Sequence, residues 1–439
     1  MPDPVSGLKN FDKPALSLYL TRERGIPMKR HYAWVIAFTG SLVILLSHGF
    51  GRMSYSVILT SMKEGLSLNY TQVGLIGTGN FIGYLCLAIL GGFLASRFGP
   101  RKVIFLSLLV MGLSLFFTGL AGSFAAAFFM RLITGMGNGG SYIPTMALPA
   151  AWFVARKRGM ATGIATIGTG IGLSLSGLCL PSVISRYGDE GWRYAWYAMG
   201  VAVFACSFLV YALERDNPAQ KGLTMYGGEE KKKDPANVTL FSAWRDIIGE
   251  KEIWKLGGVY FNYGFAYIIY LTFLIAYLNK ELGFTPNRAG MVFSVLGIFT
   301  IGSGVIWGAI SDVVGRRYGS ALAYTSLGLA SLLLVVWKGQ TGAYVSAMLF
   351  GISISAIPVI MAAAAGDAVG GRLAPAGLGF VTLFFGVGQA LGPAVAGLIK
   401  DTTGSFVSAF LLAAAICFLG AAGSLVLRKK RSLSLSPSS

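Results

Sequence analysis

Charged residues are scarce in this sequence, and acidic residues are the scarcest of them. Of its 439 residues 12% are charged, with 18 Asp and Glu against 36 Lys and Arg, whereas 54% are hydrophobic. A soluble domain carries about 25% charged residues. The composition therefore excludes a soluble globular protein and indicates an integral membrane protein.

Cysteine and histidine are also scarce, with four and two residues respectively. Cys86, Cys179, Cys206 and Cys417 lie in separate apolar stretches, without a Cys-x-x-Cys pair or a neighbouring histidine. This pattern is typical of small packing residues rather than of disulfides or metal ligands. The sequence also has no glycine-rich phosphate loop and no soluble domain for a catalytic centre. We therefore predict that the protein is not an enzyme and uses no metal or cofactor.

Long apolar runs are abundant instead. A run of about 18–25 mostly apolar residues is long enough to cross a bilayer as a helix. The runs that meet this requirement are residues 34–59, 72–95, 103–122, 126–150, 158–182, 193–213, 254–277, 288–310, 318–337, 341–365, 375–399 and 404–427. We predict an all-α integral membrane protein with twelve transmembrane helices.

The basic residues lie between these helices. With a cytoplasmic amino terminus, 27 Lys and Arg fall in cytoplasmic segments and 7 in external loops. This asymmetry predicts a multi-pass plasma-membrane protein, in a bacterial inner membrane, with both termini in the cytoplasm. The formal net charge of +18 therefore indicates contact with the lipid bilayer, and we expect no nucleic-acid partner.

Two polar segments divide the chain. Residues 1–30 have no apolar stretch long enough for a cleavable signal peptide, and Met28 offers an alternative start. The charged run 229–234 is typical of a solvated linker. The predicted parts are a disordered cytoplasmic N-terminus (1–30), an N-terminal six-helix bundle (31–213), a cytoplasmic linker (214–252), a C-terminal six-helix bundle (253–428) and a cytoplasmic tail (429–439).

The two bundles share an internal repeat at an offset of 216 residues. Matching residues begin at the second helix of each half and continue through the loop that follows it. Leu66, Gly74, Gly92, Gly99 and Arg101 fall on Leu282, Gly290, Gly308, Gly315 and Arg317. Parallel six-helix repeats are one plan of secondary transporters, with the substrate site between the halves near the bilayer midplane.

A loop rich in glycine and arginine follows the second helix and recurs after the eighth. Residues 92–102 read GFLASRFGPRK, and residues 308–317 read GAISDVVGRR. The early glycine permits close helix packing and the later one a tight turn. Both copies resemble the signature loop of the major facilitator superfamily, Gly-x-Leu-Ala-Asp-Arg-x-Gly-Arg-Arg. The resemblance implies the major facilitator fold of two six-helix bundles.

The charged residues of these loops are candidate gating residues. An aspartate and an arginine in this loop can form charge-assisted bonds that latch the cytoplasmic side. Ser96 replaces the aspartate in the first copy, whereas the second retains Asp312, so we expect a weaker latch in the first half. The candidates are Arg97, Arg101, Asp312 and Arg316.

The fourth helix carries a further motif of the superfamily. Residues 131–139, RLITGMGNG, match its Arg-x-x-x-Gly-x-Gly-x-Gly pattern. The resemblance implies a role for Arg131 in proton coupling and gating. The alternative is an arginine near the external helix end that snorkels to the interface. The fifth helix lacks the Gly-Pro-x-x-Gly-Gly sequence of the drug-antiporter branches, which disfavours an efflux pump.

Arg52 is the second arginine inside an apolar run. A guanidinium stays charged in a protein, so its burial in the membrane is costly unless it faces water or an anion. Ser41, Leu45, His48, Arg52 and Tyr55 share one face of an α-helix by their spacing. None of the 18 acidic residues falls within an apolar run. We therefore predict an anionic substrate at Arg52; the alternative is an arginine that snorkels near the helix end.

The missing carboxylates also restrict how a proton could be coupled to transport. Imidazole titrates near neutral pH, so His48 could carry the proton, and an anion bound at Arg52 would favour its protonation. The substrate carboxylate could carry the proton instead. His48 could also be a neutral packing residue.

Other polar and aromatic residues on the helices that face the predicted cavity are candidates for substrate contact. They are Asn80, Tyr84, Asn138, Tyr142, Asn262, Tyr263, Tyr267, Tyr270, Phe385 and Gln389. Tyr263, Tyr267 and Tyr270 share one helical face and could form an aromatic wall. Tyrosines at the lipid interface are the alternative interpretation.

Two branches of the superfamily share features with this sequence. Residues 31–35, HYAWV, and 152–163, WFVARKRGMATG, resemble the monocarboxylate and oxalate/formate group. The eighth helix lacks the arginine with which that group binds carboxylate. Arg52 together with Arg131 instead resembles the anion:cation symporters. The carboxylates that accompany these arginines there are absent here, so their coupling mechanism does not transfer.

The sequence thus predicts a secondary transporter that moves a small organic anion, a monocarboxylate, by alternating access. A proton is the expected coupling ion, and the protein is expected to act as a monomer. Two alternatives stay open: an exporter of amphipathic or toxic compounds, and a transporter-like sensor that does not transport.

Overall fold

The computed structural model describes residues 31–228, 247–370 and 373–427. The predicted disordered segment 1–30, residues 229–246 of the predicted linker and the predicted tail lie outside the described residues.

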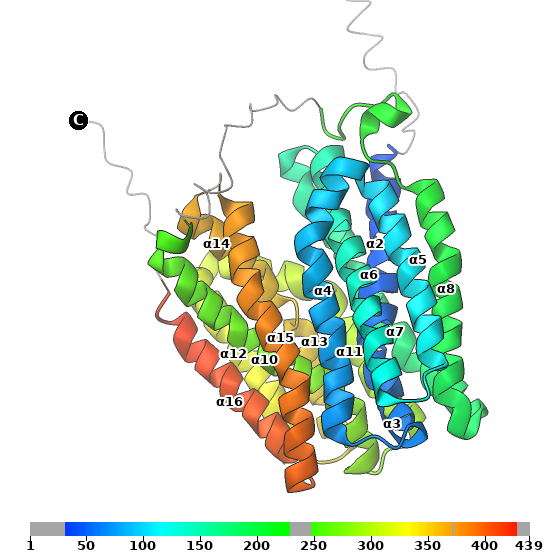
Figure 1. The fold of residues 1–439 in the computed structure, drawn as a ribbon. Helices are drawn as coiled ribbons and strands as arrows, with labels where there is room; N and C mark the ends of the chain where they lie inside the picture. The colour runs from blue at the N-terminus through cyan, green and yellow to red at the C-terminus, as the bar shows by residue number, and fades with distance from the viewer. Residues whose placement is uncertain (1–30, 229–246, 371–372, 428–439) are drawn as a thin grey trace, which may run out of the picture.

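The N-terminal half contains six membrane-crossing segments (Figure 1). The first is interrupted and consists of three helical pieces. In chain order the elements are α2 (Ala33–Ile44), the π-helix η1 (Leu45–Met53), α3 (Tyr55–Gly65), α4 (Tyr70–Phe98), α5 (Pro100–Gly119), α6 (Phe124–Trp152), α7 (Ala155–Arg186) and α8 (Gly191–Leu213), with short 3-10 turns η2 (Gly188–Glu190) and η3 (Pro218–Lys221).

The C-terminal half repeats this arrangement. Its fourth crossing segment is broken into two helices. The elements are α10 (Lys251–Lys280), α11 (Pro286–Val314), α12 (Arg316–Val336), α13 (Gln340–Ser353), α14 (Ala356–Val369), α15 (Ala374–Thr403) and α16 (Val407–Ser424).

Twelve helical crossings account for the fold. Among the described helices ten are long and apolar enough to span a membrane, or eleven when the bent helix α4 is included. The remaining crossing is α6, a 29-residue helix whose apolar stretch is interrupted by glycines and by Arg131 and Asn138. The prediction of an all-α membrane protein with twelve transmembrane helices is confirmed.

The internal repeat is visible in the backbone. Gly99 and Gly315, which are 216 residues apart, both have φ of 88° at the turn that joins two helices. A side chain is disfavoured at this φ, which explains a glycine at the same place in both loops.

The first crossing changes its helical geometry at its centre. Residues 45–53 form a π-helix, in which the Ser54 amide donates to the Gly49 carbonyl five residues earlier, at 3.0 Å. A π-turn of this kind leaves carbonyls that need other donors and is frequent at functional sites. Gly49 also permits close packing, because a Cβ at this position would lie 2.5 Å from the Cα of Gly172 on α7.

The two halves meet along helices α3, α4 and α7 on one side and α10, α11 and α15 on the other. We call the end of the bundle where α2 begins the termini end, and the opposite end the far end. The hydrogen bonds that join described residues of the two halves lie level with Arg52 or toward the far end. They include Ser56 to Thr272, Thr78 to Ala390, Ser174 to Ser294, and Tyr70 and Thr71 to Asp401.

The packing of glycines also shows that the two halves are in contact toward the far end. A Cβ on Gly74 of α4 or Gly177 of α7, in the far-end parts of these helices, would lie within 2.4 Å of the opposite half. A Cβ on Gly92 of α4, or on Gly159 or Gly163 of α7, in the termini-end parts, would have no heavy atom within 4 Å. The halves are therefore packed together at the far end and separate toward the termini end.

Candidate functional site

Arg52 lies at the centre of the interface between the halves, within the π-helix. It is 5% exposed. Its Nη2 donates to the Tyr267 hydroxyl of α10 at 3.1 Å, and its Nη1 lies 3.3 Å from the His48 Nε2. The guanidinium also lies over the rings of Phe81 and Tyr84 on α4, with its Cζ 4.5 and 5.2 Å from their centroids. Both halves therefore contribute to its surroundings.

The partners of Arg52 are all neutral. Among the described residues it makes no ion pair, and no carboxylate lies on any neighbouring turn. Its Nε has no hydrogen-bond partner within the described chain. Aromatic faces and a hydroxyl lower the cost of burying the cation but leave its charge uncompensated. A guanidinium can form bidentate charge-assisted hydrogen bonds with a carboxylate or a similar anion.

His48 lies one turn nearer the termini end than Arg52. It is half-buried, and its ring lies 4.3 Å from that of Tyr142 and 6.3 Å from that of Tyr84. Its Nδ1 has no partner among the described side chains. A solute that approaches from the termini end would meet the imidazole before the guanidinium.

The C-terminal half contributes a stack of aromatic rings. Tyr263 and Tyr267 are parallel at 4.6 Å, and Phe385 of α15 stacks on Tyr260 at 4.6 Å. The Gln389 side-chain amide donates to the Tyr267 hydroxyl. Tyr267 is therefore fixed between Arg52 and Gln389. These contacts bring the predicted residues His48, Tyr84, Tyr142, Tyr263, Tyr267, Phe385 and Gln389 around Arg52.

Asn80 and Asn138, which were predicted to touch substrate, and Arg131, which was predicted to take part in proton coupling and gating, all donate to carbonyls of the π-helix. Asn80 and Arg131 also line a cavity of about 20 Å³ together with Arg52. Arg131 Nη1 donates to the Gly51 carbonyl at 2.7 Å, and Asn80 Nδ2 approaches the same oxygen at 3.5 Å. Asn138 Nδ2 donates to the Ser47 carbonyl at 2.8 Å. The side chains of Arg131, Asn80 and Asn138 are at most 1% exposed. The π-helix leaves backbone carbonyls without their usual amide donors, and within the membrane these carbonyls need other donors. This explains why the three side chains point toward the π-helix.

Tyr55 and Tyr270 also differ from the prediction. The π-helix rotates the following residues away from an α-helical register, so Tyr55 lies beside Arg131, 5.1 Å from its Cζ, and donates to the Val73 carbonyl. Tyr270 bonds to Ser346 at 2.6 Å inside the C-terminal half. Tyr263 and Tyr267 stack on each other near Arg52, whereas Tyr270 stacks on Phe350. The three predicted tyrosines therefore do not form a single wall.

Two further residues, Asn262 and Phe81, differ in how close they lie to Arg52. Asn262 is half-buried and makes no hydrogen bond with the described residues around it. The sequence analysis missed Phe81, whose ring centroid lies 4.5 Å from the Arg52 Cζ, closer than the 5.2 Å of Tyr84. Its position next to Asn80 and one turn before Tyr84 was the available signal.

The predicted gating residues make bonds within their own halves. Arg316 pairs with Asp312 at 2.6 Å and with Asp367 at 3.5 Å. Arg101 donates from its Nε to the Tyr211 carbonyl at 2.8 Å, whereas Arg97 is exposed and lies over the Phe98 ring. Among the residues that the structure describes, these four therefore form no latch between the two halves.

The first half replaces its missing loop aspartate with a residue that the sequence analysis missed. Asp216, three residues after α8, accepts from the Arg101 backbone amide at 2.8 Å. The nearby Glu214 is buried, and neither of its carboxylate oxygens has a partner among the described residues. Burial raises the pKa of Glu214 to about 8; Asp216 adds to this shift and Arg101 opposes it.

Twelve membrane helices in two repeated halves, with a buried charged site between them, define a membrane transporter. A sequence profile of the Major Facilitator Superfamily matches residues 41–285 and 256–438. The chain therefore belongs to this superfamily. Its membership confirms the predicted family and shows a transporter rather than an enzyme.

Several named transporters are similar to this sequence over most of their length. A probable sulfoacetate transporter of Cupriavidus necator is 26% identical over 390 residues, or 85% of this chain and 89% of the relative. A hexuronate transporter of Bacillus subtilis is 22% identical over 378 residues, 82% and 87% of the two chains. A putative tartrate transporter of Agrobacterium vitis is 25% identical over 401 residues, 86% and 89%.

Solved structures show the same fold. A bacterial homologue of the human lysosomal transporter Spinster, in an inward-facing and unoccupied conformation, has a TM-score of 0.72 at 17% identity and covers 92% of this chain and 100% of that one. A nucleoside transporter has a TM-score of 0.70 at 14% identity, with coverage of 91% and 100%.

Proposed function

We propose that the protein carries a small organic anion by alternating access, with the anion bound at Arg52 between the two halves. One observation carries the proposal: Arg52 is 5% exposed and makes no ion pair among the described residues. An uncompensated buried cation is unfavourable, and a bound carboxylate or sulfonate would remove that cost through charge-assisted hydrogen bonds.

The relatives support an organic anion. Their names specify sulfoacetate, hexuronate and tartrate, all of them small acids. Arg131 lines the small cavity beside Arg52, but its Nη1 donates to the Gly51 carbonyl, so we take Arg52 as the guanidinium that pairs with the substrate. One free guanidinium balances one negative charge, which favours a monocarboxylate. An acid with two charges would need a proton on itself or on His48.

We propose a proton as the coupling ion and His48 as its carrier. Protonation of His48 would place a second positive charge 3.3 Å from Arg52, which is unfavourable until an anion is present. Anion and proton would then bind together, which is the condition for symport.

The termini end is proposed to face the cytoplasm of a bacterial inner membrane. The excess of Lys and Arg in the segments at that end supports this orientation. Since the halves are separate at the termini end, the conformation described here would receive the anion from the cytoplasmic side.

Uptake into proteoliposomes tests the proposal. Radiolabelled sulfoacetate, glucuronate, tartrate and lactate are offered under an inward proton gradient. We expect accumulation of at least one acid by the wild type, and loss of that uptake in Arg52→Gln. Wild-type uptake in Arg52→Gln would reject the site, and extrusion of a lipophilic dye without acid uptake would favour an exporter.

The same assay tests coupling. In His48→Asn, exchange of labelled for unlabelled acid should persist, while accumulation driven by the proton gradient is lost. Unchanged accumulation in His48→Asn would assign the proton to the substrate instead.

A further inference from the structure

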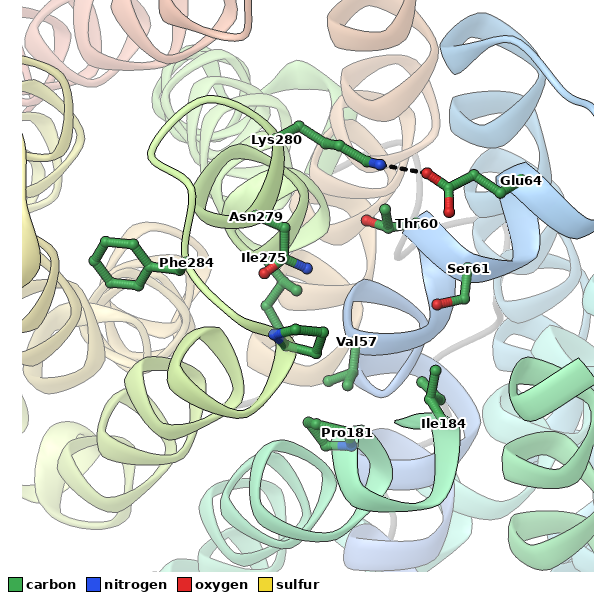
Figure 2. Close-up of a pocket in the computed structure, with 11 residues that line it drawn as sticks. Val57, Thr60, Ser61, Glu64, Pro181, Ile184, Ile275, Asn279, Lys280 and Phe284 are labelled. Carbon is green, nitrogen blue, oxygen red and sulfur yellow. Dashed lines mark hydrogen bonds and ion pairs between the residues drawn. The ribbon is translucent and has the colours of Figure 1, made fainter. Parts of the chain in front are cut away.

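A second cavity lies between the two halves near the far end of the bundle (Figure 2). Its volume is about 260 Å³, far more than the roughly 15 Å³ that one water molecule requires. The N-terminal half lines it with α3 and the end of α7, and the C-terminal half with the end of α10 and the start of α11. We call it the far-end cavity.

Two contacts place this cavity on the symmetry axis of the molecule. The Glu64 carboxylate pairs with the Lys280 ammonium, and the Ser56 hydroxyl donates to the Thr272 carbonyl at 3.1 Å. Each pair is separated by 216 residues, the offset of the internal repeat. In a parallel repeat the halves are related by an axis along the membrane normal. A residue can touch its own equivalent only near that axis.

The far-end cavity lies directly next to the central site, on the side of the far end. Arg52, Ser56 and Thr272 line a cavity of about 20 Å³. The far-end cavity begins at the next residue of α3, Val57, and at Ile275, one turn further along α10. The hydrogen bond between Ser56 and Thr272 therefore lies between the two cavities, and the Glu64–Lys280 pair lies beyond the second.

The side chains around the far-end cavity can bind an oxyanion. Lys280 supplies a cation and reaches across the cavity to Glu64 (Figure 2). Thr60 is 7% exposed, and neither its hydroxyl nor the Asn279 Oδ1 has a hydrogen-bond partner among the described residues. Buried polar atoms without partners are uncommon in native proteins. A hydroxylated acid could satisfy all three groups.

We propose that the far-end cavity is a second binding site for the transported organic anion, in which the anion replaces Glu64 as the partner of Lys280. The proposal rests on the proposed function. The side chains of Lys280 and Glu64 are 43% and 57% exposed, and such pairs contribute only about 0–1 kcal/mol. Replacement of Glu64 is therefore inexpensive. It also removes an ion pair that joins the two halves, so binding of the anion favours opening of the far end.

Transport measured separately from each side tests the proposal. The probe is the acid, among sulfoacetate, glucuronate, tartrate and lactate, that the wild type transports fastest. From the far-end side, Lys280→Gln should raise KM about tenfold, while Glu64→Gln should lower it several-fold because it removes the competing carboxylate. From the termini side, KM should stay unchanged in both variants. Lys338→Gln, which removes an exposed far-end lysine outside the cavity, is the matched control.

Opposite changes of KM in Lys280→Gln and Glu64→Gln would exclude a role of this ion pair as a simple latch. If Glu64 and Lys280 only joined the halves, both variants would change KM in the same direction, and the exchanged pair Glu64→Lys/Lys280→Glu would restore wild-type transport. Either result would overturn the far-end site while leaving anion transport at Arg52 intact. If the wild type transported none of the acids, the proposed function itself would be wrong.

A labelling experiment separates the far-end site from Arg52. Ser61→Cys places a thiol on the far-end cavity, in a chain whose four native cysteines are replaced and which also carries Arg52→Gln. We expect the same acid, added at the far-end side, to slow the reaction of this thiol with a membrane-impermeant maleimide. An unchanged labelling rate would overturn the proposal. Lys280→Gln in the same chain should remove the protection.

Discussion

Arg52 and Arg131 are both arginines buried inside membrane helices, yet their surroundings differ. Arg131 is 1% exposed, donates to the Gly51 carbonyl at 2.7 Å and lies 5.0 Å from the Trp196 ring centroid. All its partners belong to the N-terminal half. Arg52 has the Tyr267 hydroxyl of the other half as a partner and lies beside a half-buried histidine.

On the basis of this difference we propose different roles for the two arginines. The carbonyl that Arg131 holds belongs to the residue next to Arg52, so we infer that Arg131 is a positioning residue for the π-helix. The charge of Arg52 is directed at the interface between the halves, where a mobile anion can reach it. In this proposal the partners of each arginine, rather than its depth in the membrane, distinguish the positioning residue from the binding residue.

The largest expected effect comes from Arg52→Gln. Loss of a buried charge-assisted pair costs about 2–5 kcal/mol, so uptake at low substrate concentration should fall by about 30-fold or more. The melting temperature should not fall, because the variant removes an uncompensated buried charge. Initial uptake rates and thermal unfolding of the purified protein measure both quantities. A large loss of stability with normal uptake would reverse the two roles.

Arg131→Gln should mainly reduce stability. The hydrogen bond from a charged donor to the Gly51 carbonyl is worth about 1.5–3 kcal/mol, so the melting temperature should fall by several degrees. Arg131→Lys should recover part of it, since lysine can donate to the carbonyl but does not lie flat on the rings. Thermal unfolding of the three proteins checks this order. Substrate affinity lost without any change in melting temperature would contradict a positioning role.

Tyr267→Phe should weaken substrate binding moderately. The variant removes the hydroxyl that orients Arg52, and we expect KM to rise about tenfold, equivalent to about 1.4 kcal/mol. Tyr270→Phe is the control on the same helix, because its hydroxyl bonds to Ser346 inside one half. Initial rates over a range of substrate concentrations distinguish them. Equal changes in KM for both variants would contradict the site.

The smallest effect is expected at Glu214, outside the membrane-spanning helices. Its pKa of about 8 lies above the ordinary value, so the folded protein holds a proton that the unfolded chain has lost. Stability therefore falls as pH rises from the ordinary carboxyl pKa to about 8. At pH 8, Glu214→Gln should melt on the order of 2 °C above the wild type. At pH 5 the two proteins should melt at the same temperature. An equal difference at both pH values would contradict the titration.

The sequence was sufficient for the architecture and for the central arginine. Apolar runs, the repeat and the loops at Gly99 and Gly315 are local patterns, and the structure follows them. Arg52 could be selected because membrane burial of a charge is rare. The surroundings of Arg52 were harder to predict, since they depend on which helix faces which neighbour.

The π-helix is the feature that periodicity could not predict. An α-helical register places Tyr55 on the face of Arg52, whereas residues 45–53 adopt another period and turn Tyr55 toward Arg131. Asn80 and Asn138 donate to backbone carbonyls of the same segment. Every residue has a backbone carbonyl, so the sequence does not indicate which carbonyls will accept these bonds. The side-chain roles of those two residues could therefore be assigned only from the structure.

Equilibrium binding of the transported acid to the purified protein tests the central claim most directly. Calorimetric titrations compare the wild type, Arg52→Gln and Arg131→Lys in one detergent at one pH. We predict that Arg52→Gln loses the tight site and retains at most the weaker binding at Lys280, while Arg131→Lys binds nearly as the wild type does. Wild-type affinity in Arg52→Gln would contradict an anion site at Arg52.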